Sequence, residues 1–199
     1  MGKIAALLLA AGLSTRMGTT SKALLPWENT TLIDYQVESL RNAGVDFIIV
    51  VTGFQHEKLK PQILSMSNIK IIYNPLYHTG KASSVKAGLS LIDPNSIDAI
   101  LVCSVDQPRN HLTIRSILDQ HIQTQSLVTI PTFLGKGGHP TVFSYSLFEE
   151  MKAITDSTFG LKSIIHNHPV DLFEVGTKEI LIDLNTRSDY EKASGNNSY

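Results

Sequence analysis

A short stretch near the amino terminus combines an apolar run, a glycine-bearing loop and two cations. Residues 7–22 read LLLAAGLSTRMGTTSK. The small residues Ala10, Ala11 and Gly12 let main-chain N–H groups come close to an anion, and Arg16 and Lys22 are placed to neutralise several phosphate charges. The stretch fits neither GxxxxGK[ST] nor GxGxxG, so it supports neither a P-loop nor a dinucleotide fingerprint. Two other interpretations compete: a surface loop with two solvated cations, and a short secretory signal.

A carboxylate follows the fourth apolar run of the chain. The sequence there is CSVDQP, and Asp106 is expected at the carboxyl edge of the sheet, where ligands bind in open α/β folds. Mg²⁺ prefers one or two carboxylates together with phosphate oxygens, so Asp106 is a candidate ligand. Near the end of the chain, Asp183 and Asn185 have period-two spacing and would share one side of an extended segment. One of them could complete a metal site with Asp106. The alternatives are that Asp106 caps a turn and that Asn185 or Thr186 caps a helix.

Two further motifs are expected near the ligand. In TGKASSVKAGL, Ser83 and Ser84 stand at a helix start, where hydroxyl and free N–H groups can bind a base edge, a ribose or an anion; plain helix capping is the alternative. The run GKGGHP carries His139, and its glycines predict a mobile loop or a turn that admits a ligand. Three other residues are interpreted as structural: His166, His168 and Cys103.

Strands that end together must position these residues. Near-continuous apolar runs, typical of parallel strands covered on both faces, recur along the chain. They are Ile4–Leu9, Phe47–Thr52, Ile69–Tyr73 and Ala99–Val105. Amphipathic helices are expected between them: one from Thr31 to Gly44, one through Val85, Leu89 and Ile92, and one capped by Asn110. Pro61 is expected to start or break a helix over 55–65. This alternation predicts a doubly wound α/β fold.

The pattern changes after residue 125. We expect two extended stretches around the glycine-rich turn, short helices over 147–154 and 161–166, and closing strands in DLFEV and ILIDL. No repeat, low-complexity segment or linker divides the 199 residues. We therefore predict one domain over residues 1–194 and a frayed tail over 195–199.

The composition is that of an ordinary globular protein, with 42% hydrophobic and 18% charged residues. A formal net charge of −1 gives no support for a nucleic-acid or membrane-surface binder. The single cysteine excludes a disulfide within these residues, and no apolar run reaches the roughly 18 residues of a membrane span. We expect a cytoplasmic protein with neither nucleic acid nor membrane as a partner.

Taken together, the motifs resemble the MobA-like NTP transferases, the nucleotidyltransferases of molybdenum-cofactor maturation and their relatives. That family carries LAAGxSxRMG followed by a lysine, matched by residues 9–18 and Lys22. Further matches follow in the same order: a G…SS…GL helix start at 80–89, DQP at 106–108, GHP at 138–140 and a D-x-[DN]-T-P-x-D-like segment at 183–189. The resemblance covers nearly the whole chain. It implies a three-layer, Rossmann-like nucleotidyltransferase fold with a mostly parallel central sheet.

The resemblance implies transfer of a nucleoside monophosphate from an NTP to a phosphorylated acceptor, whose terminal phosphate attacks the α-phosphorus while pyrophosphate leaves. The implied catalytic residues are Arg16, Lys22 and Asp106. The implied nucleotide-binding residues are Leu9, Ala10, Ala11, Gly12, Ser14, Arg16, Lys22, Ser83 and Ser84. The implied acceptor loop is Gly138, His139 and Pro140. The implied cofactor is Mg²⁺, held by Asp106 with Asp183 or Asn185.

Two positions depart from the family pattern. Arg187 replaces the proline after Thr186, and Asn185 is a neutral residue and a weaker Mg²⁺ ligand than a carboxylate. Members with Ala-Ala-Gly in the first motif resemble cytidylyl transferases, whereas guanylyl members tend to have Ala-Gly-Gly. Residues 10–12 therefore favour CTP, with molybdopterin or its molybdenum-loaded form as the acceptor.

Several alternatives stay open. A guanylyltransferase of the same cofactor and a sugar-phosphate nucleotidyltransferase would use the same scaffold. A non-catalytic carrier or insertion chaperone would bind the cofactor for a molybdoenzyme partner. A dinucleotide-dependent oxidoreductase is disfavoured by the missing GxGxxG.

Overall fold

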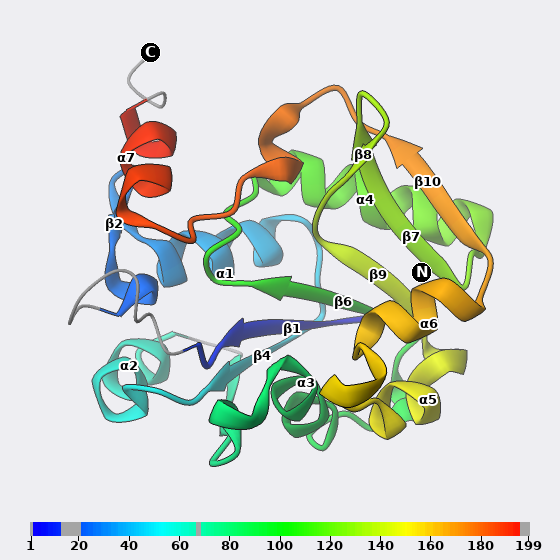
Figure 1. Cartoon of the computed structure of the whole chain (residues 1–199), viewed down its shortest axis with the longest axis horizontal. Coiled ribbons are helices and arrows are strands. Elements are labelled where there is room, and N and C mark those ends of the chain that lie inside the picture. Colours follow the sequence, from blue (N-terminus) through cyan, green and yellow to red (C-terminus); the bar gives the residue numbers. More distant parts are fainter. Residues whose placement is uncertain (1, 13–20, 67–68, 196–199) are drawn as a thin grey trace.

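The computed structural model describes residues 2–12, 21–66 and 69–195. A central sheet carries helices on both faces (Figure 1). Its strand order is β10-β7-β9-β6-β1-β4-β5, and β8 pairs with β7 at one side. These strands are β1 (Ile4–Ala10), β4 (Phe47–Thr52), β5 (Ile69–Tyr73), β6 (Ala99–Ser104), β7 (Val128–Phe133), β8 (Lys136–Gly137), β9 (Thr141–Ser144) and β10 (Val170–Glu174). A separate hairpin joins β2 (Pro26–Trp27) to β3 (Thr30–Thr31).

The order of the strands fixes where a ligand can bind. β1 pairs in parallel with β4 on one side and with β6 on the other, whereas β9 runs antiparallel to both β6 and β7. The chain thus moves outward from β1 to β4 and β5, and then returns to add β6 on the opposite side of β1. Such a reversal opens a crevice at the carboxyl ends of the strands.

The two faces of β1 build two separate cores. The helices are α1 (Leu32–Asn42), α2 (His56–Leu64), α3 (Lys81–Leu89), α4 (His111–Thr124), α5 (Phe148–Ala153), α6 (Leu161–Asn167) and α7 (Arg187–Gly195). Ile4, Ala6 and Leu8 of β1 belong to the cluster that includes residues of α1, α2 and α4. Ala5 and Leu7 belong to the cluster that includes residues of α3, α5 and α6. Because successive strand residues point to opposite faces, β1 is apolar throughout. The expected three-layer, mostly parallel α/β fold is confirmed.

Local sequence signals place the helices as expected. The Thr31 side chain accepts a hydrogen bond from the N–H of Asp34 at the start of α1. The Asn110 side chain accepts one from the N–H of Leu112 at the start of α4. Both side chains satisfy donors that a helix start leaves unpaired. The segments expected as short helices become α5 and α6, and DLFEV supplies β10.

Two expectations about local structure are wrong. Pro61 neither starts nor breaks α2 but lies inside it; the buried side chains of Leu59 and Ile63 anchor the helix on either side, and such packing outweighs a lost helical bond. ILIDL is not a strand: a 3-10 helix, η7, covers Lys178–Leu181. The carbonyl oxygens of Ile180 and Ile182 accept hydrogen bonds from Arg109 instead of from a neighbouring strand.

The carboxyl terminus is more ordered than expected at one position. α7 extends to Gly195, the first residue of the predicted tail, and residues 196–199 lie outside the described part. The extent of the domain stays a prediction. Among the described residues, the helices are all too short or too polar to cross a membrane.

Candidate active site

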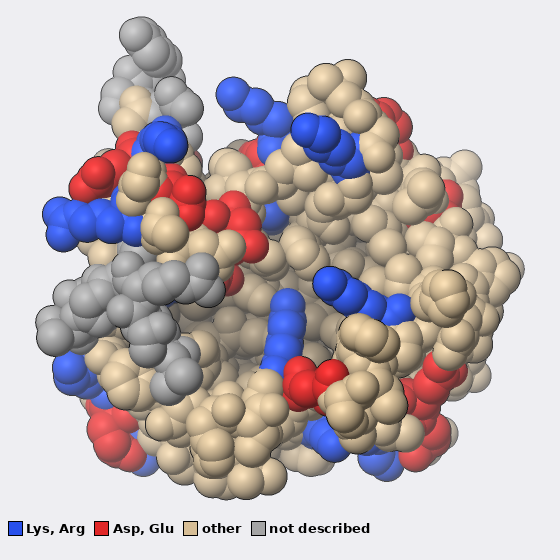
Figure 2. Space-filling model, in the orientation of Figure 1, with Lys and Arg blue, Asp and Glu red and all other residues tan. Residues whose placement is uncertain are grey.

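A hollow of about 450 Å³ opens at the carboxyl ends of β1 and β6. It lies at the point where the strand order reverses, and Figure 2 shows basic side chains reaching into the hollowed centre of this face. Its lining is Leu9, Ala10, Ala11, Gly12, Ser21, Lys22, Ala23, Tyr77, His78, Gly80, Lys81, Ser84, Ser104, Val105, Asp106 and Asn185. The structure thus brings the first four residues of the LAAGxSxRMG motif, residues 9–12, together with Lys22, Asp106, Ser84 and Asn185. Ser14 and Arg16 lie outside the described residues.

The loop after β1 offers main chain to this hollow. Ala10 and Ala11 are buried, while a Cβ atom built on Gly12 meets no described heavy atom within 4 Å. Gly53, directly after β4, packs closely against this loop. A Cβ there would lie 2.5 Å from the Tyr77 side chain and 2.8 Å from the Ala11 carbonyl oxygen, so a larger residue would not fit. The loop is therefore supported on its inner side and open toward a ligand.

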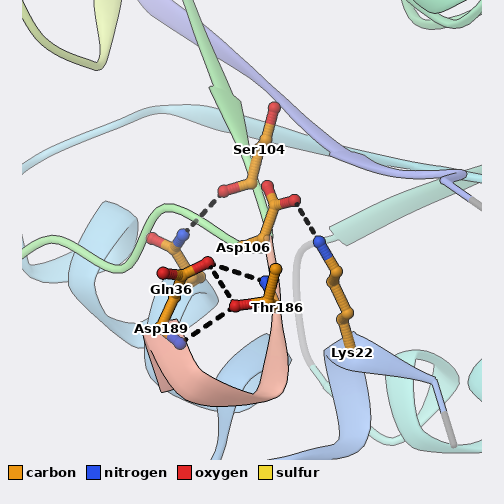
Figure 3. A network of polar contacts seen from close by, with 6 residues as sticks. All are labelled: Lys22, Gln36, Ser104, Asp106, Thr186 and Asp189. Atoms are coloured by element: carbon orange, nitrogen blue, oxygen red, sulfur yellow. Dashed lines mark hydrogen bonds and ion pairs between the residues drawn. The ribbon is translucent and has the colours of Figure 1, made fainter. Parts of the chain in front are cut away.

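Lys22 and Asp106 meet at the centre of the site. Lys22 begins the 3-10 helix η2 (Lys22–Leu24), and its Nζ lies 3.0 Å from Asp106 Oδ2 (Figure 3). The turn that carries Asp106 is fixed from below by Gln36, a buried residue of α1. Its Nε2 donates to the carbonyl oxygens of Ser104 and Gln107, at 2.9 and 2.8 Å. Asp106 is thus held at the sheet edge independently of a ligand.

The segment after η7 reaches the same edge. The N–H of Leu184 donates to the carbonyl oxygen of Asp106 at 2.9 Å. Asp183 and Asn185 come together through a tight turn, in which the Asn185 N–H donates to the Asp183 carbonyl oxygen, and not along the extended segment expected from their spacing. Thr186 then caps α7 as one of the alternatives predicted, exchanging hydrogen bonds with Asp189 (Figure 3).

The charges of this segment suit a divalent cation. Burial, followed by the neighbouring charge of Asp106, raises the pKa of Asp183, whereas a hydrogen bond from Asn185 opposes that rise. Asn185 and Asp106 line the hollow, whereas Asp183 is not part of the lining but is close enough for the charge of Asp106 to affect its pKa. Within residues 2–12, 21–66 and 69–195, no three His, Cys, Asp or Glu side chains group as a complete metal cage. Two carboxylates and an amide oxygen fit Mg²⁺, which takes its remaining ligands from substrate phosphates and water.

The two serines of α3 have different surroundings. Both hydroxyl groups accept hydrogen bonds from Asn74 Nδ2, at 2.9 Å for Ser83 and 3.0 Å for Ser84. Only Ser84 lines the main hollow; Ser83 lines a second hollow of about 510 Å³ on the other side of α3. Neither serine caps the helix, because Gly80 is the N-cap residue.

The expected anion position at the start of α3 is taken by the chain itself. The N–H of Ala82 donates to both carboxylate oxygens of Asp156, at 3.1 and 3.3 Å. A Cβ on Gly80 would lie 2.2 Å from this carboxylate, so the glycine is required there. Free N–H groups of α3 are therefore less available to a phosphate than the sequence indicates.

The GHP loop lies beside the hollow but not in its lining. The N–H groups of Gly138 and His139 donate to the carbonyl oxygens of Pro131 and Ile180, at 2.8 and 3.0 Å. These bonds make the loop a fixed turn, one of the two forms expected. Burial, and then the positive charges of Lys81 and Arg109, lower the pKa of His139 to about 4, so its ring is neutral at pH 7. Pro140 is buried.

Sequence reasoning missed two basic residues. Lys81 lines the hollow and influences the pKa of His139; the signal was its place directly after Gly80 at a helix start. Arg109 follows the DQP motif by one residue and is almost completely buried. Of the residues expected to be structural, His168 pairs with Glu150 at 2.6 Å, and burial raises the pKa of the Cys103 thiol to about 12. His166 is exposed, and its expected role stays a prediction.

The sequence is similar to a known domain family and to named proteins. The MobA-like NTP transferase domain matches residues 6–172. The chain is 30% identical over 193 residues to the molybdenum cofactor cytidylyltransferase of Escherichia coli K12, covering 96% of this chain and 95% of that protein. It is 26% identical over 192 residues to the nicotine blue oxidoreductase of Paenarthrobacter nicotinovorans, covering 92% of each.

A solved structure shares the whole fold. Rv0371c of Mycobacterium tuberculosis H37Rv matches with a TM-score of 0.84 at 25% identity, covering 98% of both chains. The same protein in complex with manganese matches with a TM-score of 0.77 at 24% identity, covering 97% of this chain and 98% of that one. With the domain family matching most of its length, the chain belongs to the MobA-like NTP transferases and is a nucleotidyltransferase.

Proposed function

We propose that this enzyme transfers CMP from CTP to the terminal phosphate of molybdopterin or molybdenum cofactor and releases pyrophosphate. The observation that carries the proposal is the pairing of Lys22 with Asp106 at the end of β6, beside the open loop of residues 10–12. Such a transfer requires a cation that binds phosphate, a carboxylate that binds the metal, and main-chain N–H groups that the substrate can approach. The name of the Escherichia coli relative supports the substrates.

In the proposed reaction the chain positions reactants and stabilises charge. The main chain of residues 9–12 holds the base and phosphates, with Ser84 beside them. Lys22 and Arg16 bind the triphosphate and stabilise the charge that grows on the leaving pyrophosphate. The loop at residues 138–140 faces the acceptor, and Lys81, which lines the hollow, is close enough to affect the pKa of His139 in this loop. No protein nucleophile is needed, because the acceptor phosphate itself attacks the α-phosphorus.

A magnesium ion is the proposed cofactor. Asp106 would hold it, with Asp183 or Asn185 as the second ligand. When bound, the ion would neutralise phosphate charge and orient the triphosphate. The manganese complex of the mycobacterial structure supports a divalent ion at this fold.

CTP is proposed over GTP because Ala10-Ala11-Gly12 presents a methyl-bearing residue where guanylyl members tend to carry a second glycine. A sugar phosphate is the competing acceptor, and a guanylyl transfer the competing reaction. The proposed compartment is the cytoplasm, where Cys103 stays reduced, and a molybdoenzyme that receives the product is the proposed partner.

A redox function is the second candidate, because a relative of matching length is named an oxidoreductase. This candidate requires a nicotinamide or flavin that the purified protein binds. Absorbance and fluorescence of the purified enzyme, with NADH and NADPH added in turn, test it directly.

The proposed function is tested by thermal unfolding with Mg²⁺ and each of CTP, GTP, ATP and UTP. A ligand at 100 times its Kd stabilises the fold by about 2.7 kcal/mol. We expect the largest rise in Tm with CTP, and a loss of that rise in Asp106→Asn. An equal rise with GTP would favour the guanylyl reaction, and no rise with any nucleotide would contradict nucleotidyl transfer.

A further inference from the structure

Arg109 is a buried cation that lies behind the candidate site. Its side chain follows Asp106 by three positions, and the residue is 1% exposed. The guanidinium donates to four main-chain carbonyl oxygens: Nε to His139 at 2.9 Å, Nη1 to Pro108 at 2.7 Å, and Nη2 to Ile180 and Ile182 at 2.7 and 2.9 Å. One side chain therefore binds three separate segments of the chain.

The three segments carry the candidate metal ligands and the expected acceptor loop. Pro108 belongs to the turn that carries Asp106, and His139 to the GHP loop. Ile180 and Ile182 lead directly to Asp183 and Asn185. The segments also bond to one another: the Ile180 carbonyl oxygen accepts from the His139 N–H as well, and the Leu184 N–H donates to Asp106. Arg109 lies at the centre of this arrangement.

Burying the charge of Arg109 costs free energy that an apolar residue at this position would not cost. Moving a cation out of water costs several kcal/mol unless hydrogen bonds and opposite charges compensate. Burial lowers the pKa of Arg109 to about 10, although Glu179, Asp183 and Asp106 oppose that shift; the guanidinium thus stays charged at pH 7. Its planar fork spreads five donors over three nitrogen atoms and can reach carbonyl groups of separate segments at once, whereas lysine has three donors on one nitrogen and an apolar side chain has none.

We propose that Arg109 is a positioning residue: through these carbonyl groups it holds the acceptor loop and the 183–185 segment in register with Asp106. The roles of the positioned groups in metal and acceptor binding rest on the proposed function. The hydrogen bonds by which Arg109 positions them belong to the fold and do not depend on that function. Arg109 touches no substrate in this account. It acts on the metal-ligand segment and on the acceptor loop, and leaves the nucleotide loop after β1 untouched.

The test compares Arg109→Lys with the matched surface variant Arg115→Lys, whose arginine pairs with Asp119 on α4. Hydrogen exchange is measured on the ligand-free proteins. In Arg109→Lys we expect the amides of His139 and Leu184 to exchange about fivefold faster, because loss of one such hydrogen bond costs about 1 kcal/mol of local stability. Amides of β1 should keep their protection, and Arg115→Lys should change neither set.

A second readout separates positioning from general destabilisation. Mn²⁺ binding is followed by electron paramagnetic resonance in the presence of α,β-methylene CTP, and binding of that analogue is also measured without metal. Arg109→Lys should weaken Mn²⁺ binding by about tenfold, as is common for groups that orient metal ligands. The metal-free affinity for the analogue should stay within about twofold, since the β1 loop is unchanged.

Three results bear on the proposal in different ways. Wild-type exchange rates at His139 and Leu184 in Arg109→Lys would overturn it, as would an equal loss of Mn²⁺ and nucleotide affinity. A wild-type protein that binds neither Mn²⁺ nor nucleotide would contradict the proposed function, and the exchange rates would still decide the role of Arg109. If Arg109→Lys does not fold, native-state exchange of the wild type decides: the two amides must open with one common free energy, and different values would overturn the proposal.

Discussion

Lys22 Nζ and Asp106 Oδ2 lie 3.0 Å apart although 84 residues separate them in the sequence. Their side chains are 13% and 23% exposed, respectively, so the ion pair is largely buried but still accessible from the hollow. In the proposed reaction the lysine would turn to phosphate and the carboxylate to metal. Each charge therefore has an opposite charge beside it both before and after the substrate binds. The ligand-free protein thus avoids the free-energy cost of an unpaired, partly buried charge.

Asp106→Asn should abolish most of the transfer activity while leaving the fold intact. The amide keeps the shape of the side chain but lacks the charge for a divalent ion, and loss of a group that stabilises transition-state charge costs about 10²- to 10³-fold in rate. Pyrophosphate release with Mg²⁺, molybdopterin and saturating CTP measures the effect. Asp119→Asn, which removes an exposed partner of Arg115, is the control and should keep wild-type activity. A rate for Asp106→Asn within a few-fold of wild type would exclude Asp106 as a metal ligand.

Ser84→Ala should weaken nucleotide binding, whereas Ser83→Ala should not. Both serines accept a hydrogen bond from Asn74, but only Ser84 lines the main hollow. Loss of one hydrogen bond to a substrate costs about 1 kcal/mol, or roughly fivefold in affinity. Titration of CTP by isothermal calorimetry compares the pair directly. Equal affinities for the two variants would show that α3 does not contact the nucleotide through Ser84.

Asp183→Asn should stabilise the ligand-free protein at neutral pH. The pKa of Asp183 is raised by burial and by Asp106, so its ionised form is less favourable in the fold than in the unfolded chain. Its contribution is fully favourable below the unfolded pKa of 3.8 and is lost as pH rises through the folded pKa. Calorimetry should show a higher Tm than wild type at pH 7 and equal values near pH 3. A lower Tm at pH 7 would mean that the carboxylate is held by favourable contacts in the absence of metal.

The protein should lose stability when mildly acidified, in part through His121. This residue of α4 bonds to Thr129 in the core at 2.8 Å, and burial lowers its pKa from 6.5 to about 4. Between these values the unfolded chain binds the extra proton, so the free energy of unfolding falls with pH by about 1.4 kcal/mol per unit for this residue. Urea unfolding at pH 7 and pH 5 should show a flatter dependence in His121→Gln. His166→Gln, at an exposed position, should retain the wild-type slope, and equal slopes for both variants would exclude His121 as a source.

The hydrophobic pattern of the sequence was sufficient to predict the layers of the fold. β1 lies between two strands and between two layers of helices, so every one of its residues is buried, and its uniform apolar run already indicates this environment. Asp106 directly follows such a run, and the carboxyl edge of a strand is where its side chain had to lie. Chain order alone thus brought Asp106 and residues 10–12 to one place.

Contacts between segments that are distant in the sequence could not be predicted from the local pattern. ILIDL has the composition of a strand, yet Arg109, some 70 residues earlier, binds its carbonyl groups and removes them from the sheet. Asp156 likewise reaches the start of α3 from 74 residues away. Spacing within a motif carries no information about such partners, since tertiary packing selects them after the local elements have formed.

The most direct test of the central claim is pyrophosphate release from each of CTP, GTP, ATP and UTP with Mg²⁺ and molybdopterin. We expect release that depends on the acceptor, is fastest with CTP, and yields an acceptor bearing CMP on its terminal phosphate. Release from GTP alone would contradict the choice of base. No release from any nucleotide, by a folded enzyme with both metal and acceptor present, would contradict the proposed reaction.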